Sequence, residues 1–274
     1  YHSPTKGGFK KKSLTTLHGY KALLAFSFCF LIFFISFLFP VIQMLYWTII
    51  FPKHLIDLDL ISLFSNTIIL VLLSSFVLIS FAFISNYGNR LSKSKFLEIL
   101  TTFSISGYAI PGIILAVAFI TFISWFDNNI INFFDLKNIK SIFIGSILGL
   151  VIVYFIRFYS LASNGIKSGY LKISYSIDES AYLLGYSKFK TFRNIHIPYL
   201  RNSILLIGIL IAIEIIKELP ITLIMRPFNF ETFATQAYIY ASQDLLEAAA
   251  APSLFLILIA SFFILITSRY ILKD

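Results

Sequence analysis

The sequence predicts an all-α, six-span helical membrane protein with both termini on the cytoplasmic side of the membrane. Three observations lead to this fold class. The 274 residues are 58% hydrophobic and only 13% charged, with a mean hydropathy of +0.86, which is too apolar for one soluble domain. Long stretches contain no Asp, Glu, Lys or Arg, and the charges between these stretches alternate along the chain.

A helix needs about 20 apolar residues to cross the ~30 Å hydrocarbon core of a membrane. A basic tail at 1–21 is expected to stay in the cytoplasm and to lead into a first span at 22–51, after which the main transmembrane domain covers 60–268. Arg157 follows a short uncharged run and is expected to snorkel, which extends the fourth span toward residue 160. The remaining spans are expected at about 60–86, 99–126, 141–160, 202–225 and 248–268.

The formal charges of the segments between these spans support this topology. In chain order, the N-terminal tail, the five loops and the C-terminal segment carry +5, −1, +2, 0, +5, −3 and +1. Cytoplasmic segments of membrane proteins are enriched in Lys and Arg, and here every second segment is the more basic one. The alternation places both termini inside. It also accounts for the net charge of +9 without a nucleic-acid partner.

The sequence lacks the residue patterns of an enzyme or a metal protein. Cys29 is the single cysteine and lies in the first span, and the four histidines have no ligand-like spacing. The chain contains no G-x-x-x-x-G-K-[ST], H-E-x-x-H or G-x-S-x-G string. We therefore expect no catalytic residue, no metal site and no bound cofactor. The energy for any transport has to come from a partner or an ion gradient.

The longest internal loop, about 161–201, is predicted to hold a short helix–turn–helix on the cytoplasmic face. Ser176 and Glu179 fit the S-x-x-E capping box, so a helix is expected to begin there. Gly185 stands where a helix end favours a residue that tolerates the left-handed conformation. A second, basic helix would then lead to Pro198, near the first turn of the fifth span.

The spacing within this loop resembles the E-A-A, three residues, G, nine residues, I-x-L-P signature of the permease subunits of bacterial ABC importers. Ser180 and Ile197 depart from the signature, and both replacements are conservative in size. The resemblance implies a coupling helix, which docks in a groove of a separate ATPase subunit and transmits its closure to the spans. An ordinary capped loop, with Glu179 at a positive helix end, is the alternative. The matching residues are Glu179, Ala181, Gly185, Ile195 and Pro198.

The third span contains Gly107-Tyr108-Ala109-Ile110-Pro111-Gly112, which predicts a kink or a break because Pro111 removes a backbone hydrogen bond. Interrupted helices often line the substrate path of transporters, so Pro111 is a candidate residue of a translocation path. Ordinary helix packing is an equally simple explanation, since glycine and proline are common in membrane helices.

The fifth span is interrupted by three charged residues, Glu214, Lys217 and Glu218, and then by Pro220. Their spacing predicts that Lys217 lies between the two carboxylates on one helix face. Charged groups inside a membrane usually point to a bundle interior or a water-filled cavity, so these four residues are candidates for a gate along a translocation path. The alternative is a self-neutralised cluster of ion pairs that holds the helices together.

The segment 217–235 resembles the K-E-L-P-x-T…R-P-F-x-F-x-T-x-A segment of ferric-iron permeases of the Fbp and Sfu type, a family close to permeases for thiamine, polyamines and phosphonates. The resemblance extends over about 17–265. Such permeases are commonly one polypeptide with two six-span halves. This chain resembles the second half, and its opening Tyr1 fits an excision or cleavage point. In the outer segment, Arg226 and Glu231 are candidates for docking a substrate-binding protein.

These resemblances imply a type-I ABC importer transmembrane domain in the bacterial plasma (inner) membrane, a non-catalytic subunit that imports a substrate, with ferric iron expected. The implied partners are ATPase subunits that bind ATP and Mg, a second permease half, a substrate-binding protein and membrane lipid. An ion-coupled secondary carrier stays open as an alternative. It would use Glu214 and Glu218 and need no ATPase, but it leaves the loop spacing unexplained. A membrane scaffold without transport explains neither the loop nor the polar fifth span.

Overall fold

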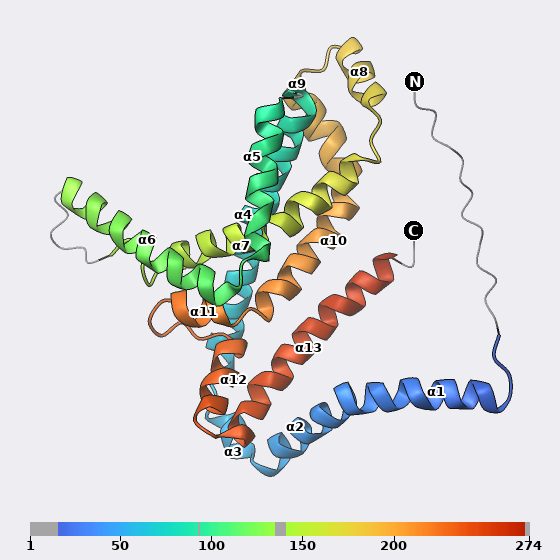
Figure 1. The fold of residues 1–274 in the computed structure, drawn as a ribbon, viewed down its shortest axis with the longest axis vertical. Coiled ribbons are helices and arrows are strands. Elements are labelled where there is room, and N and C mark those ends of the chain that lie inside the picture. The colour runs from blue at the N-terminus through green and yellow to red at the C-terminus, as the bar shows by residue number, and fades with distance from the viewer. Residues whose placement is uncertain (1–15, 93, 135–140, 272–274) are drawn as a thin grey trace.

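The computed structural model describes residues 16–92, 94–134 and 141–271, so residues 1–15 of the predicted basic tail lie outside the described part. Within these ranges every regular element is a helix (Figure 1), and six helical segments are long and apolar enough to cross a membrane. The predicted all-α, six-span fold class is confirmed. The side of the membrane on which each terminus lies stays a prediction.

Six spans account for most of the chain, and shorter helices connect them. The spans consist of α1 (Tyr20–Phe33), η1 (Phe34–Leu38) and α2 (Phe39–Ile50); α4 (Leu60–Ser92); α6 (Gly112–Phe133); α7 (Ile147–Tyr170); α9 (Lys188–Thr191), η3 (Phe192–His196) and α10 (Ile197–Ile216); and α13 (Leu246–Ile271). The connecting elements are α3 (Pro52–Ile56), α5 (Lys95–Ile105), η2 (Ser106–Ala109), α8 (Tyr175–Leu183), α11 (Pro220–Met225) and α12 (Phe233–Ser242). The bounds differ most from the expected ones in the third, fourth and fifth spans.

The third span begins later than expected because the helix breaks at Pro111. The residues before the break form α5 and η2, Ile110 is extended (φ −81°, ψ 129°), and α6 starts a new helix. Pro111 caps α6, and its carbonyl accepts the N–H of Leu115 (3.1 Å). Proline has no N–H to donate and disfavours helical geometry in the residue before it, so the break falls between Ile110 and Pro111.

The fourth span, α7, continues well past Arg157 and so places this residue inside the spanning helix. The helix begins after Ser146, whose side chain accepts the N–H of Gly149 (3.1 Å). Just before it, the buried Asp127 carboxylate of α6 accepts N–H bonds from residues 142–144. The expectation that Arg157 snorkels from the end of this span is wrong, because its guanidinium finds partners within the protein.

The fifth span begins earlier than expected, because α9, η3 and α10 form one continuous helix from Lys188 to Ile216. Pro198 lies inside this helix, and η3, just before it, is a π-helical turn. The first span has the same arrangement, with η1 just before Pro40. A proline ring collides with the carbonyl four residues earlier, and a wider π turn there lets the helix continue past the proline. The basic segment before Pro198 is thus part of the fifth span.

The second, fourth and fifth spans form the centre of the bundle (Figure 1). Their fully buried side chains include Leu78 of α4, Phe158 of α7 and Ile211 of α10. Gly165 and Gly169 of α7 lie against α10, and a Cβ at Gly165 would lie 2.5 Å from Ile207 Cγ1. Small residues at this four-residue spacing let two membrane helices approach closely.

The first span contacts the bundle through its second half, α2, which lies along α13, whereas its first half lies apart. α1 extends away from the other helices in Figure 1, and none of the residues of α1, η1 or α2 is buried. Its surface carries many large apolar side chains, such as Phe26, Phe30 and Ile35. In a membrane such a surface is suited to contact lipid or another subunit.

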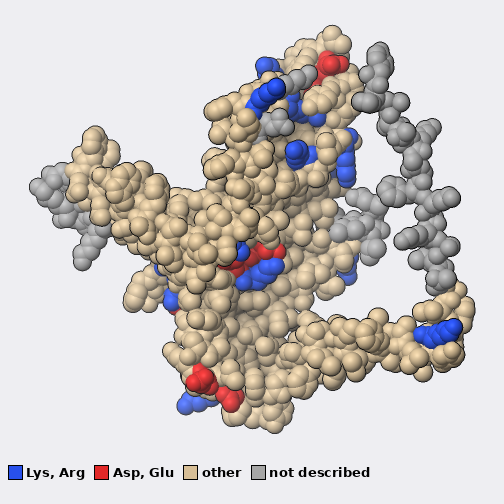
Figure 2. Space-filling view, in the orientation of Figure 1, with Lys and Arg blue, Asp and Glu red and all other residues tan. Residues whose placement is uncertain are grey.

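The two ends of the bundle differ in charge (Figure 2). Lys and Arg side chains gather at the end that carries α8 and α9, whereas Asp and Glu side chains dominate the small charged group at the end that carries α3 and α12. A third group, with both signs of charge, lies midway between the ends. Because cytoplasmic loops are enriched in basic residues, the end with α8 and α9 is the better candidate for the cytoplasmic one.

Candidate functional site

The predicted coupling loop forms a helix–turn–helix from α8 and α9 at the basic end of the bundle. α8 begins after Ser174, whose side chain accepts the N–H of Ser176 (3.2 Å). The expected capping box of Ser176 and Glu179 is wrong, because the helix starts earlier and Glu179 lies beyond its first turn. The Glu179 side chain is exposed instead of reaching back to the helix start.

The predicted turn at Gly185 is present. Gly185 has φ +79°, in the left-handed region, and its N–H donates to the Tyr182 carbonyl (3.0 Å). The N–H of Tyr186 donates to the Ala181 carbonyl (3.0 Å). These two bonds make a Schellman motif, which satisfies the Ala181 and Tyr182 carbonyls near the end of α8. Ser187 then caps α9 with its side chain, so the chain reverses sharply between the two helices.

The tip of this loop exposes large apolar side chains. Leu183 is 89% exposed, Leu184 78% and Phe189 71%. Outside a membrane, an apolar patch of this kind marks a surface that another protein covers. The predicted coupling residues differ in exposure. The structure exposes Glu179, Gly185 and Pro198. It leaves Ile195 half-buried and Ala181 buried.

A buried ionic cluster lies beneath the loop, and sequence reasoning missed it. The Asp178 carboxylate of α8 lies 2.7 Å from Arg90 Nε, near the end of α4, and 2.8 Å from His196 Nε2, at the end of η3. Asp178 is 7% exposed and His196 is fully buried. The only signal in the sequence is that Asp178 and His196 adjoin the motif residues Glu179 and Ile195. Three separate helices meet at one carboxylate, and Arg90 is distant from the other two residues in the chain.

The charged residues of the fifth span do not form the expected single cluster. α10 ends at Ile216, and Lys217 pairs with Glu214 (2.7 Å) at a partly exposed surface. Glu218 lies beyond the helix end, is buried, and pairs with Arg157 of α7 (Nε to Oε2, 3.4 Å). The expectation that Lys217 lies between both carboxylates is wrong, because the helix ends before Glu218 and the two residues no longer share a helix face.

Arg157 connects the interruptions of the third and fifth spans. Its Nη1 donates to the Ile110 carbonyl (2.6 Å), next to Pro111, while its Nε pairs with Glu218. Gly112 makes room for this contact, since a Cβ there would lie 2.7 Å from Glu218 Oε1. The candidate path residues Pro111 and Glu218 therefore lie close together. Sequence patterns could not predict this contact, because the residue that joins Pro111 and Glu218 belongs to a third helix.

The interruption of the fifth span is a defined structure that several hydrogen bonds hold in place. Glu218 Oε1 accepts the N–H of Ile221 (3.3 Å), and Thr222 Oγ1 donates to the Glu218 carbonyl (2.6 Å). Thr222 also forms a hydrogen bond with the buried Tyr154 of α7. Pro220 begins α11, a position where the missing N–H removes no helical bond.

The predicted docking residues Arg226 and Glu231 form an ion pair with each other, and both side chains stay partly exposed. Arg226 Nη1 also donates to the Phe230 carbonyl (3.4 Å), and Glu231 accepts a hydrogen bond from the Thr235 hydroxyl (2.8 Å). Thr232 and Thr235 form the capping box that begins α12. These contacts hold the turn between α11 and α12.

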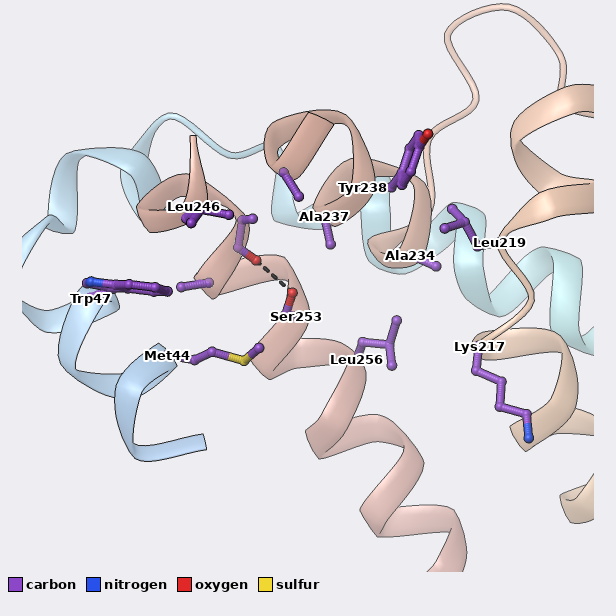
Figure 3. Close-up of a pocket in the computed structure, with 13 residues that line it drawn as sticks. Met44, Trp47, Lys217, Leu219, Ala234, Ala237, Tyr238, Leu246, Ser253 and Leu256 are labelled. Atoms are coloured by element: carbon purple, nitrogen blue, oxygen red, sulfur yellow. Dashed lines mark hydrogen bonds between the residues drawn. The ribbon is translucent and has the colours of Figure 1, made fainter. Parts of the chain in front are cut away.

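A groove of about 410 Å³ lies between α2, α12 and α13 and reaches the interrupted end of the fifth span (Figure 3). Trp47 and Lys217 lie at opposite sides of the groove. About half of the residues that line the groove are small, and a surface of small side chains is suited to close contact with another membrane helix. The small residues that line the groove are Ala234, Ala237, Ala241, Ala249, Ala250 and Ser253.

No family model matches the chain. The fold is that of a chain in the crystal structure of a bacterial alginate ABC transporter in complex with an alginate pentasaccharide-bound periplasmic protein (TM-score 0.69, 16% identity, 91% of this chain and 93% of that chain). A bacterial ABC transporter involved in the import of the acidic polysaccharide alginate is equally similar (TM-score 0.68, 17% identity, 91% and 94%). The chain is thus a multi-pass membrane protein with the fold of an ABC importer permease.

The sequence is also similar to a named transport protein. It is 23% identical over 276 residues to the Fe(3+)-transport system permease protein FbpB 2 of Haemophilus influenzae. The match covers 100% of this chain and 52% of the relative, so the chain spans about half the length of that protein. The predicted resemblance to ABC importer permeases of the ferric-iron type is confirmed.

Proposed function

We propose that the chain is the membrane-spanning permease subunit of an ATP-driven importer in the bacterial plasma (inner) membrane, with both termini in the cytoplasm. The observation that carries this proposal is the tip of the coupling loop, which exposes Leu183, Leu184 and Phe189 at the basic end of the bundle. Basic loops stay in the cytoplasm, where an apolar tip needs a protein to cover it. An ABC ATPase subunit is the proposed partner.

In this arrangement the chain does no covalent chemistry and binds no cofactor, because ATP and Mg bind to the ATPase subunits. α8 follows the closure of the ATPases, and the spans alternate between inward-open and outward-open states. Each predicted coupling residue has a part in this. Gly185 sets the turn, Glu179 is available at the surface, and the buried Ala181 packs α8 on the bundle. Ile195 and Pro198 link the loop to the fifth span.

The translocation path is proposed to run along the surface that carries Glu214 and Lys217. These side chains are 24% and 55% exposed at the end of α10, which Figure 1 shows midway between the two ends of the bundle. Charged groups at that level are costly in contact with lipid and favour a water-filled cavity. Pro111 and Pro220 begin the helices that follow the two interruptions, so movement of either helix would change the path.

A second permease half is proposed to enclose this path. The chain spans about half the length of its relative, which leaves room for such a half in a longer protein or in a separate chain. Two features of the described residues support this partner. The first span buries none of its residues, and the groove lined by alanines offers a surface for a further helix.

Ferric iron is the proposed substrate, delivered by a binding protein that docks near Arg226 and Glu231. The support is the resemblance to FbpB 2, whose name records Fe(3+) transport. The described residues contain no group of three or more His, Cys, Asp or Glu side chains suited to a metal ion, so metal recognition is assigned to the binding protein. Thiamine, polyamines and phosphonates are the alternatives to iron.

The test is capture of the ATPase encoded beside this chain, in detergent and with the second half present. Leu183→Glu places a charge on the apolar tip and is expected to lower the captured ATPase roughly tenfold, as loss of a central apolar contact does in other interfaces. Phe228→Glu is the matched control, because Phe228 is 93% exposed in the turn between α11 and α12. Equal capture by the wild type and Leu183→Glu would overturn the assignment.

The same preparation separates the importer from an ion-coupled carrier. We expect uptake of radioactive ferric iron into proteoliposomes to need ATP, the ATPase and the binding protein. Uptake that needs a proton or sodium gradient but no ATPase would favour the carrier, with Glu214 and Glu218 as its coupling site.

A further inference from the structure

We infer that Arg90, Asp178 and His196 are positioning residues that fasten α8 to the second and fifth spans, so that a displacement of α8 moves both spans with it. This inference rests on the coupling role proposed for α8. It concerns residues outside the coupling motif and explains how a short surface helix could transmit force to the membrane-spanning part.

The attachment of α8 to the bundle depends on very few side chains. Of the residues in this helix, the structure buries only Asp178 and Ala181. Ala181 contributes one methyl group, whereas the Asp178 carboxylate uses both oxygens, one toward Arg90 and one toward His196. Asp178 is therefore the one buried charged group of α8, and its carboxylate contacts two different spans.

Arg90 holds the start of α8 at several points. In addition to the pair with Asp178 (2.7 Å), its Nη2 donates to the Ser174 carbonyl (3.0 Å) and its Nη1 to the Tyr170 carbonyl (3.5 Å). The guanidinium also lies over the Tyr175 ring, 4.3 Å from its centroid. One side chain from the end of α4 thus joins the end of α7 to the first turn of α8. The planar fork of arginine suits such multiple contacts better than lysine.

His196 connects the same carboxylate to the fifth span. Its Nε2 lies 2.8 Å from Asp178 Oδ1, which is within ion-pair distance, although the angle between the two groups is not that of a hydrogen bond. The imidazole is fully buried and lies between the rings of Tyr87 and Tyr170, with centroids 5.2 and 5.4 Å away. Tyr87 also donates its hydroxyl to the Lys188 carbonyl (2.6 Å), at the first residue of this span.

This arrangement fits a positioning role better than a simple gain in stability. A buried ion pair often adds little net stability, because removing the charges from water is costly, but it fixes the geometry of its partners. Here the fixed geometry is that of α8 relative to α4 and the fifth span. Removal of the negative charge would leave α8 held by apolar contacts of Ile177 and Ala181 and by the weaker contacts of Arg90 with the helix start.

The test measures the distance between α8 and the fifth span in the full chain, reconstituted in lipid nanodiscs with its partner half. Nitroxide labels are placed at Ser180→Cys on α8 and Leu205→Cys on α10, two exposed positions, in a Cys29→Ser background. Double electron–electron resonance is recorded without the ATPase and then with the ATPase and a non-hydrolysable ATP analogue. A second pair, Leu72→Cys with Leu205→Cys, reports on the bundle itself.

We expect one narrow distance distribution for the wild type in both conditions. In Asp178→Asn and in Arg90→Lys the distribution of distances between the labels at positions 180 and 205 should become roughly twice as broad. A surface helix that has lost its contacts with the bundle is expected to move over a wider range. The bundle pair should stay narrow. Asp244→Asn removes a carboxylate from an exposed position and should change neither distance.

Three results would overturn the inference. The first is an unchanged distribution in both Asp178→Asn and Arg90→Lys. The second is equal broadening of the bundle pair, which would show a general loss of packing. The third is a wild-type distance that changes when the nucleotide binds. If Asp178→Asn does not insert, Arg90→Lys decides, since it keeps the positive charge. Failure of the proposed function would instead show as no ATPase capture, while the measurement without ATPase still tests the fastening.

Discussion

Arg157 is the residue whose surroundings explain most about the centre of this protein. An arginine in the middle of a membrane span is costly unless it finds partners within the protein. Here the guanidinium satisfies the Ile110 carbonyl, which the break at Pro111 leaves without a helical donor, and it neutralises the buried Glu218. One side chain thereby compensates for two interrupted helices.

Replacing Arg157 is expected to destabilise the bundle strongly. Arg157→Met leaves the Glu218 charge buried without a partner, which typically costs about 3–5 kcal/mol. Denaturant unfolding in detergent, followed by tryptophan fluorescence, measures the loss. Arg201→Met is the control, since Arg201 is exposed on the same bundle and should change the free energy of unfolding by less than about 0.5 kcal/mol. Similar values for the two variants would contradict the role of Arg157.

Gly185 allows a sharper test at a single residue. Its φ of +79° is costly for a β-branched side chain, so Gly185→Val is expected to distort the end of α8 and reduce ATPase capture. Gly185→Asn is the matched variant, because asparagine tolerates the left-handed conformation. Capture should therefore be retained in Gly185→Asn. If both variants capture the ATPase equally, the turn is not required for docking.

At the level of elements, the close contact between α7 and α10 depends on glycines of α7, which have no side chain at the helix interface. Gly165→Val should push Ile207 away and lower the free energy of unfolding by about 1–3 kcal/mol, the usual cost of overpacking. Gly88→Ala in α4 is the control of opposite sign, because nothing lies within 4 Å of its Cβ position. That change should stabilise slightly. The same unfolding assay measures both, and a neutral Gly165→Val would disprove the close contact.

The sequence predicted which helices exist better than where they end. Apolar runs locate the spans because a membrane demands about 20 uncharged residues, and this requirement is local. The ends depend on tertiary context. Pro198 was expected near a helix start, but a π turn carries the helix through it, and the span reaches back to Lys188. Conversely, α10 ends at Ile216, where Glu218 leaves the helix to meet Arg157.

In the coupling loop, too, the features that depend on neighbouring residues were predictable and those that depend on distant residues were not. The turn at Gly185 was predictable, because the left-handed position is read from neighbouring residues alone. The cluster around Asp178 was not, since its partners Arg90 and His196 come from elements that only the fold brings together. The N-cap of α8 is Ser174 and not the expected Ser176, because the local sequence pattern does not distinguish the two serines.

On the scale of the whole molecule, the groove between α2, α12 and α13 leads to a prediction about assembly. Ala249→Phe fills the groove and is expected to reduce co-purification of a second permease half roughly tenfold, because the small residues that allow close helix contact are lost. Leu258→Phe, an exposed position on the same helix, should leave co-purification unchanged. Retained association in Ala249→Phe would place the partner half elsewhere.

The contacts of Arg157 also bear on the order in which the ribosome delivers the spans to the translocon. α6 and α7 are the least hydropathic of the six spans, each with a value of 1.6, and an arginine at a helix centre adds about 2.5–3.5 kcal/mol to the cost of insertion. The Ile110 carbonyl is synthesised before Arg157, whereas Glu218 follows only with the next span. We expect the third and fourth spans to enter the lipid as a pair, with the guanidinium held by a backbone oxygen until its counter-ion has been translated.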